Sequence, residues 1–249
     1  MDQAWWSPGL MRPNGRATFT LGFNGGLFVD RQGQRFMNES LPYDRAGREI
    51  IAAMKAGTVT LPFWLVFDSR DGGAPPIQFP NQPIGDLEGY RKAGLLRSGA
   101  TLAELAGAIG VPATTLEETV KRFNGFAERG EDADFDRGGE PYDRAFTEGR
   151  APLDTVSRAP FHAIAFGLSD LGTKGGLRTD PHARVLDKDG KAIGGLYATG
   201  NAMAAVSGET YPGGGNPIGS SMVFAHLAAL DMAASPGGRA GQGVPEKAG

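Results

Sequence analysis

Hydrophobic and polar positions alternate along residues 17–37, on either side of Gly25-Gly26 and Gln32-Gly33. Alternation with a period of two is typical of half-buried strands, and Gly-containing pairs of this kind are typical of tight turns. We therefore expect strands in this segment. A helix is predicted to follow from about Tyr43 to Met54, and the apolar run Phe63–Phe67 after a proline predicts a buried strand.

Between residues 101 and 129 the hydrophobic period becomes helical. Two threonine–glutamate pairs have the S/T-x-x-E spacing of a capping box, and they are Thr101 with Glu104 and Thr115 with Glu118. The pattern predicts two helices that meet at residues 110–112, followed by a loop-rich segment from Glu131 to Pro160.

The layout of these two helices is similar to a helix-turn-helix DNA reader. Glu117 and Glu118 would then lie in the first turn of the second helix, where they would be repelled by phosphates. The whole chain has 25 Lys and Arg against 28 Asp and Glu, a net charge of −3, so it lacks the basic excess that attracts nucleic acid. A packed helical cap is the favoured interpretation, and we expect no nucleic-acid partner.

Strand patterns return after residue 160, in FHAIAFGL, in a hairpin around Asp189-Gly190 and in the run GGLYATGN. The last helix is predicted to begin near Gly219, and because it is apolar almost all round we expect it to be deeply packed. Residues 236–249 mix glycine, proline and charge, which predicts a disordered tail.

Composition restricts the chemistry that the chain can perform. Cysteine is absent, which excludes disulfides and thiolate sites, so redox work would need a borrowed cofactor. The three histidines lie far apart, and no metal site is expected. No run of about 18 apolar residues offers a membrane span, and no secretory signal is recognised, so we expect a soluble, cytoplasmic protein. Trp5 and Trp6 need a partner surface so early in the chain that we expect an internal segment of a longer protein.

Thirty-nine glycines include a cluster at residues 213–215, in a loop that leads straight into the last helix. A helix N-terminus has free N–H groups and a partial positive charge, so this one suits an anionic ligand. A glycine-rich turn capped by Ser220 explains the same spacing. The residues alone do not decide between the two.

Residues 160–233 contain GTKGGLRTD, a hairpin, GLYATGN and TYPGGGNPIGSSMVFA. This combination resembles the carboxy-terminal part of FAD-dependent flavoproteins of the fumarate reductase and 3-ketosteroid dehydrogenase superfamily. GLFVDRQGQRFMNESLPYD is similar to the passage from FAD domain to substrate domain, and TVKRFNGFAERGEDADFDRG to the cap. Tyr211, followed by Pro-Gly and by a glycine four residues on, resembles the ketosteroid 1-dehydrogenase branch.

The resemblance implies an α+β protein, with an α/β FAD-domain remnant and an inserted α+β substrate domain, from which the amino-terminal dinucleotide-binding βαβ unit is missing. The expected parts are residual FAD-domain strands at 1–40, a substrate and cap domain at 41–160, the carboxy-terminal FAD-domain portion at 161–235 and the tail at 236–249. The implied cofactor is non-covalent FAD, with its ADP-binding half outside this chain. The implied partners are a steroid-like ketone, an external electron acceptor and a matching amino-terminal half.

The resemblance also implies roles for individual residues. Tyr43 matches the tyrosine that accepts the C2 proton, a task for which a phenol with an ordinary pKa near 10 needs assistance. Tyr211 and the backbone N–H of Gly215 match the groups that grip the C3 carbonyl and stabilise the enolate. The positions implied to lie close to the flavin are Gly200, Asn201, Pro217, Ile218, Gly219 and Ser220.

One departure from the branch leaves alternatives open. Asn216-Pro217 stands where the branch commonly has Ala-Thr, so the double bond that is introduced is in doubt. A fumarate reductase type enzyme would need cations around a dicarboxylate, and none occurs between Asn201 and Met222, although Arg45 and Arg48 could contribute. A non-catalytic fragment that cannot hold FAD is the third possibility.

Overall fold

The computed structural model describes residues 3–145, 147 and 149–235. These residues form two compact units: a larger one from Trp6 to Leu171, and a smaller one from the described residues of 1–5 and 172–249. The units divide the chain at other places than the domain boundaries expected after residues 40 and 160, and the assignment of FAD and substrate domains stays a prediction. The expected disordered tail at 236–249 lies outside the described residues.

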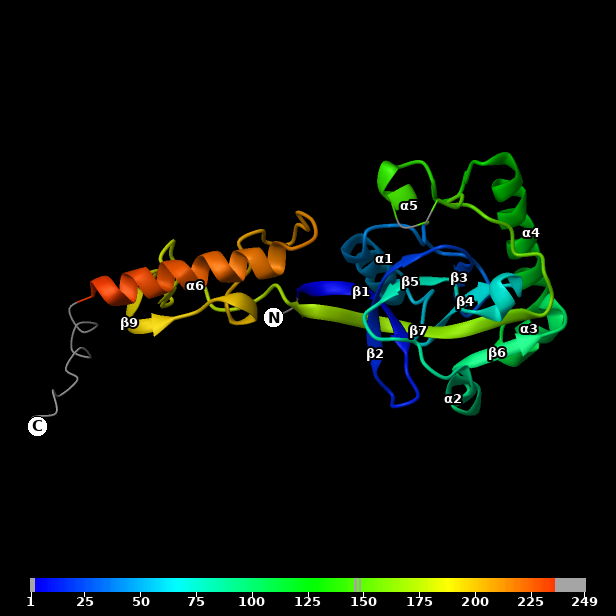
Figure 1. Cartoon of the computed structure of the whole chain (residues 1–249), viewed down its shortest axis with the longest axis horizontal. Coiled ribbons are helices and arrows are strands. Elements are labelled where there is room, and N and C mark those ends of the chain that lie inside the picture. The colour runs from blue at the N-terminus through cyan, green and yellow to red at the C-terminus, as the bar shows by residue number, and fades with distance from the viewer. Residues whose placement is uncertain (1–2, 146, 148, 236–249) are drawn as a thin grey trace, which may run out of the picture. The chain divides into compact units, whose positions relative to one another are not determined.

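A mixed arrangement of sheet and helices forms the larger unit (Figure 1). Its sheet has the strand order β3-β4-β7-β1-β2-β5, and β6 also pairs with β7. The strands are β1 (Ala4–Met11), β2 (Ala17–Phe23), β3 (Leu27–Val29), β4 (Phe63–Phe67), β5 (Ile77–Pro80), β6 (Leu96–Gly99) and β7 (Phe161–Thr173). The strands predicted in 17–37, at 63–67 and after residue 160 are therefore confirmed, whereas β1 was not predicted.

Strands β3, β4 and β7 of this sheet are buried on both faces. Side chains along a strand alternate between faces, and neighbouring residues of β3, β4 and β7 accordingly belong to two different hydrophobic clusters. One cluster packs with α1 (Tyr43–Lys55) and α2 (Leu87–Lys92), and the other with α3 (Leu102–Ile109) and α4 (Ala113–Arg129). Burial on both faces explains why residues 63–67 read as a continuous apolar run.

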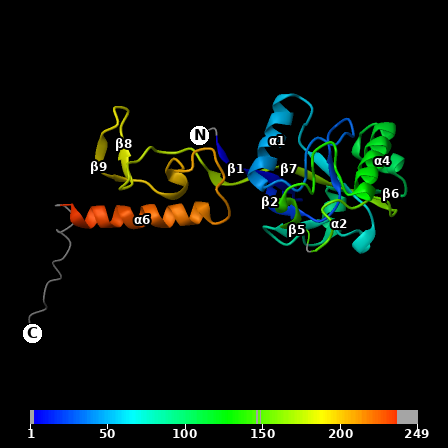
Figure 2. The same ribbon diagram turned by 90° about the horizontal axis from the view of Figure 1, so that it is seen from above.

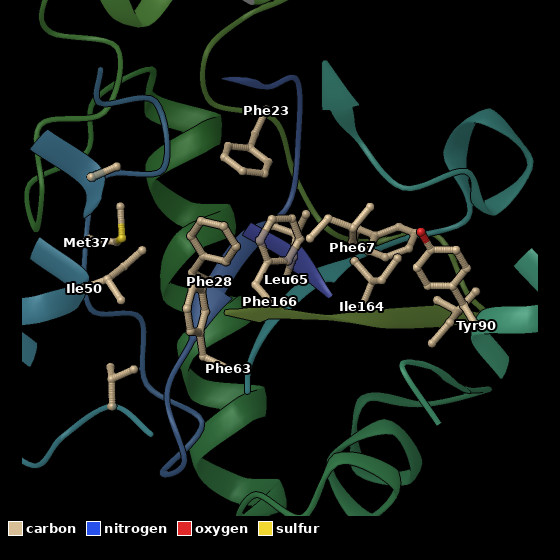
Figure 3. Close-up of a cluster of buried hydrophobic side chains, with 14 residues drawn as sticks. Phe23, Phe28, Met37, Ile50, Phe63, Leu65, Phe67, Tyr90, Ile164 and Phe166 are labelled. Atoms are coloured by element: carbon tan, nitrogen blue, oxygen red, sulfur yellow. The ribbon is translucent and has the colours of Figure 1, made fainter. Parts of the chain in front are cut away.

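Aromatic rings fill the first of these clusters (Figure 3). The Phe28 ring centroid lies 5.0 Å from that of Phe63 and 5.1 Å from that of Phe166, and both pairs meet edge to face. Such pairs add about 0.5–1.5 kcal/mol to the gain from burial. The three rings come from β3, β4 and β7, so they hold these three neighbouring strands together.

The helix pair on the other face confirms one predicted capping box and corrects the other. Thr101 Oγ1 accepts from the Glu104 N–H at 3.1 Å, and Glu104 returns a bond to the N–H of Ala100. The second box is wrong, because α4 begins at Ala113 after an N-cap at Pro112 and Thr115 lies inside the helix. Proline fixes its own backbone angle and brings the start of the helix forward. The segment expected to be a loop after residue 131 also contains α5 (Pro141–Ala145).

The smaller unit consists of the hairpin β8 (Arg184–Leu186) and β9 (Ala192–Tyr197), the short helix η2 (Gly200–Ala202) and α6 (Asn216–Ala234). The hairpin predicted around Asp189-Gly190 is confirmed, and Gly190 takes a φ of 80° in its turn. Helix α6 runs alongside the hairpin in both views (Figures 1 and 2). Tyr197 of β9 donates to Asp231 of α6 at 2.7 Å.

Helix α6 is more exposed than the sequence predicts. It begins at Asn216, three residues before the expected start, and of its residues Ala228 alone is buried. Ile218 and Met222 are 69% and 67% exposed. An apolar face on every side needs cover on every side, and the hairpin and η2 lie along only part of it. The expectation of deep packing is therefore wrong for this chain.

Among the described residues, α6 is a helix long and apolar enough to cross a membrane by length and composition, with a mean hydropathy of 1.2 over 18 residues. This corrects the expectation that no such stretch exists. The core helices of soluble proteins pass the same test, and α6 also contains His226 and Asp231. The finding is therefore weak evidence for a membrane span.

Candidate flavin and ketone site

A glycine-rich loop carries the candidate ketone-binding groups into α6. Gly215 is the N-cap of the helix with a φ of 87°, and Gly213 has a φ of 133°. Both angles lie in the region that side chains rarely adopt, so the turn requires glycine at these two positions. The Gly219 N–H donates to the Gly215 carbonyl at 2.8 Å and closes the first helical turn. Tyr211 and Gly215 therefore lie in the same short loop, directly before the first turn of the helix.

The N-terminus of α6 is open. Ile218 and Gly219 are exposed. A Cβ added at Gly214, Gly215 or Gly219 would meet no atom within 4 Å. The first turn contains no acidic residue to neutralise the positive end of the helix dipole. The glycine positions at this end therefore leave space beside the backbone, as the approach of an anionic or electron-rich ring requires.

Ser220 does not cap this helix. Its hydroxyl donates to the Asn216 carbonyl at 2.7 Å, one turn back along the helix, and Gly215 occupies the cap position. The alternative interpretation described the loop as a turn capped by Ser220, and its assignment of the capping residue is therefore wrong.

Gly200 and Asn201 lie against the first turns of α6. Thr199 Oγ1 donates to the Ser221 carbonyl at 2.9 Å, and a Cβ on Gly200 would lie 3.4 Å from Ser221 Oγ. The Asn201 carbonyl accepts from Thr173 Oγ1 at 2.8 Å. Within the smaller unit, the structure therefore brings together the expected flavin-side residues from two separate segments, 200–201 and 217–220.

Tyr211 is half-buried and packs on Trp5. The two ring centroids are 5.9 Å apart, with the rings at 70° to each other, and Trp5 is buried. Trp5 thus finds within the smaller unit the partner surface that the sequence indicated it needs. The ring contact fixes one side of the phenol, while the glycines after Pro212 fix the backbone that follows it.

Tyr43 belongs to the larger unit, so the structure positions it independently of Tyr211 and Gly215. It is the first residue of α1 and is 4% exposed. Its ring meets Phe19 edge to face at 5.3 Å. Gly47, one turn further along α1, lies so close to Trp6 that an added Cβ would be 2.6 Å from the Trp6 backbone carbon. Phe19 and Trp6 thus hold the start of α1 against the sheet.

The segment that leads to Tyr43 is anchored by a buried ion cluster that the sequence analysis missed. Glu39 accepts from Arg35 at 2.7 and 2.8 Å and from Arg137 at 2.9 Å, and Arg35 also pairs with Asp132 at 2.6 Å. The side chains of Glu39 and Arg137 are fully buried. The i, i+4 spacing of Arg35 and Glu39 was visible in the sequence, but the contribution of Arg137, 98 residues away, was not.

Charge compensation within this cluster is strong. Burial alone would raise the pKa of Glu39, but attraction to Arg35 and Arg137 outweighs it, so the pKa lies below its ordinary value. Burial would likewise lower the pKa of Arg35, and the carboxylates of Glu39 and Asp132 raise it instead. Both shifts favour the charged forms of Glu39 and Arg35.

Two arginines that could have served a dicarboxylate are engaged with carboxylates of this chain. Arg45 Nη1 lies 3.2 Å from Glu140, and Arg48 Nε lies 3.1 Å from Asp44. These pairs reduce the cationic character that a fumarate-type site would need.

His162 is placed between two serine hydroxyl groups. Its ring nitrogens lie 2.9 Å from Ser69 Oγ and 2.7 Å from Ser98 Oγ, between β4 and β6. Burial, and then the charge of Arg91, lower the pKa of His162. Within the described part of the chain, no group of three or more His, Asp or Glu side chains is arranged to hold a metal ion.

The candidate site is thus a glycine-rich turn before α6, with the Tyr211 ring packed on Trp5 beside it. The family model for the FAD binding domain matches residues 1–218, and the chain belongs to this family. FAD is therefore the cofactor that the family assignment implies.

The relatives indicate which branch of the family this chain resembles. The chain is 40% identical over 258 residues to a 3-oxosteroid 1-dehydrogenase of Mycobacterium tuberculosis, covering 96% of this chain and 44% of that protein. A crystal structure of 3-ketosteroid delta1-dehydrogenase from Sterolibacterium denitrificans in complex with 1,4-androstadiene-3,17-dione matches with a TM-score of 0.81 at 35% identity, covering 92% of this chain and 43% of that one. The chain spans less than half the length of both.

A more distant relative is the fumarate reductase (cytochrome) of Shewanella frigidimarina, 29% identical over 84% of this chain and 32% of that protein. The comparisons thus confirm the expected resemblance and favour the ketosteroid branch over the fumarate reductase branch.

Proposed function

We propose that this chain supplies the flavin-ring side and the ketone side of an FAD-dependent dehydrogenase that desaturates a 3-keto steroid or a similar cyclic ketone. The observation that supports this most is the turn at residues 211–215, which carries a phenol and a glycine N–H directly into the open end of α6. Gly200 and Asn201 lie beside the same helix end.

The flavin-side residues fit the cofactor that the family implies. Bound FAD supplies the chemistry of hydride acceptance from C1. The N-terminal turn of α6, through Pro217, Ile218, Gly219 and Ser220, would hold the pyrimidine ring and stabilise the negative charge of the reduced flavin. Glycines at 200, 215 and 219 leave room for a close approach of the backbone.

Three groups of this chain would act on the ketone. Tyr43 would take the proton from C2, while the Tyr211 hydroxyl and the Gly215 N–H donate to the C3 carbonyl oxygen. The two donors would bind the oxygen more strongly as enolate charge develops, and losing one such donor typically costs about 10²–10³ in rate. Asn216-Pro217 would shape the edge between flavin and ketone, and this edge would select the bond that is desaturated.

The exposed face of α6 indicates how the complete protein would assemble. A matching FAD-binding half, folded against the apolar residues of α6, would cover this face and supply the ADP site. Residues 1–40 and 161–235 would then complete the FAD domain and residues 41–160 form the substrate domain, in a cytoplasmic enzyme that passes electrons to an external acceptor.

Co-expression with the remaining portion of the mycobacterial relative tests the proposal. We expect the two parts to co-purify with yellow, bound flavin and to reduce an artificial electron acceptor when a 3-keto steroid is supplied. Tyr43→Phe and Tyr211→Phe should each lower kcat by about 10²-fold or more with unchanged flavin content, because both serve the ketone. Loss of flavin in both variants would contradict the assigned roles.

Two outcomes would favour the alternatives. Turnover with fumarate but not with a ketosteroid would move the assignment to the fumarate reductase branch. A complex that contains flavin but turns over neither substrate would indicate a binding or structural protein. The chain purified alone is expected to be colourless.

A further inference from the structure

Lys174 is a buried lysine in the smaller unit. It is 3% exposed. Its Nζ donates to the Glu209 carbonyl oxygen at 2.9 Å and lies 4.2 Å from the centroid of the Trp5 ring. A buried ammonium is costly unless its charge is compensated. Here a carbonyl dipole and the negative face of an indole contribute to the compensation.

The backbone of Lys174 joins the same segments as its side chain. Its N–H donates to the Gln3 carbonyl at 2.9 Å, and its carbonyl accepts from the Ala205 N–H at 2.8 Å. One residue therefore links the segment before β1, the end of β7 and the loop after η2.

The glycines around Lys174 make this close packing feasible. Gly172 has a φ of 128°, and an added Cβ there would lie 2.5 Å from the Asn201 side chain. At Gly176 an added Cβ would lie 2.6 Å from the Met203 backbone carbon. The GTKGG motif thus lets its chain pass directly against residues 201–204, with the lysine turned toward the loop of Tyr211.

We infer that Lys174 is a positioning residue for Tyr211. Its ammonium fixes the carbonyl two residues before Tyr211, and the same ammonium lies over the Trp5 ring, with which the Tyr211 ring makes an edge-to-face contact. Removing the charge would release the loop at Glu209 and loosen the indole against which the phenol is oriented. The consequence for turnover rests on the proposed function, but the effect on the loop does not.

Hydrogen exchange of the full chain tests the effect on the loop without any cofactor. Lys174→Met keeps the length of the side chain and removes its charge and donors. We expect exchange in peptides covering 205–213 to become about tenfold faster in this variant, because a hydrogen bond from a charged donor is lost. Peptides of the β8–β9 hairpin should be unchanged. Lys191→Met, at an exposed lysine of the hairpin, is the matched control and should leave 205–213 unchanged.

Lys174→Arg distinguishes positioning from simple filling of space. Arginine keeps the charge and a donor, so exchange in 205–213 should return to within about threefold of wild type. Three results would overturn the inference: equal exchange in wild type and K174M, K174R no better than K174M, or accelerated exchange throughout the hairpin as well.

The complex with the complementary half provides the second readout. K174M should lower kcat with ketosteroid by about tenfold, with little change in KM and in flavin content, because a misplaced donor weakens the transition state more than the ground state. K174R should recover most of the activity. If the complex has no ketosteroid activity while the loop exchange behaves as expected, the proposed function fails and the structural role of Lys174 stands.

Discussion

Glu39→Gln tests the ion cluster that anchors the segment before Tyr43. The substitution keeps the size of the side chain and removes its negative charge. Glu39 accepts from Arg35, from Arg137 and from the Phe28 N–H, the last at 3.0 Å. After the change, Arg35 still pairs with Asp132, whereas the fully buried Arg137 loses its carboxylate.

The expected loss is large because one partner of a buried pair is removed while the other stays charged. Such changes typically cost about 3–5 kcal/mol. Glu140→Gln breaks a comparable contact to Arg45 at the surface, where both side chains are about half exposed. That control should cost less than about 1 kcal/mol, because water screens the exposed pair.

The pH dependence of the loss has a defined sign. The pKa of Glu39 is lower in the folded chain than its ordinary value of 4.5. Its stabilising contribution is therefore fully present above pH 4.5 and is lost as the pH falls through the lower, folded pKa. The difference in stability between wild type and E39Q should be constant near neutral pH and shrink below pH 4.5.

Urea unfolding followed by tryptophan fluorescence measures these differences. A Trp5→Phe background leaves Trp6 and Trp64, both in the larger unit that contains the cluster. A loss below about 1 kcal/mol for E39Q at pH 7, or a difference that grows as the pH falls, would refute the reasoning.

Two further pairs of substitutions test the packing of individual elements. Gly47→Ala should destabilise the larger unit by about 2 kcal/mol or more, because the added Cβ would collide with the Trp6 backbone. At Gly107 an added Cβ would meet no atom within 4 Å, so Gly107→Ala should instead stabilise α3 by about 1 kcal/mol in the same unfolding assay. Thr101→Ala should cost about 1 kcal/mol through loss of the N-cap, whereas Thr115→Ala, inside α4, should be nearly neutral. Equal effects at the two threonines would contradict the corrected start of α4.

Much of the larger unit was predictable because its signals are local. The alternation around residue 25, the apolar run at 63–67 and the box at Thr101 each report the geometry of one segment, and each became the expected element. The order of the strands was not predictable in this way. β2 pairs with β1 and β5 rather than with β3, its neighbour in sequence, because pairing depends on contacts between distant segments.

Some residues of the candidate site were predictable from the sequence and others were not, for the same reason. Gly213 and Gly215 were recognisable in the sequence, because a turn with positive φ allows few other residues. Lys174 and Arg137 did not, because a charged residue in a sequence reads as a solvated one until its partners are known. Both became visible only when the fold placed a carbonyl, an indole or a carboxylate beside them.

The hydrophobic pattern of helix α6 predicted burial on all sides, which the structure does not show. Its residues are apolar on all sides, and the structure leaves Ile218, Met222, Val223 and Leu230 more than half exposed. The pattern specifies how much surface must be removed from water but not which polypeptide removes it. The same open surface that contradicts the expected packing would leave the N-terminal turn of α6 accessible to the proposed cofactor.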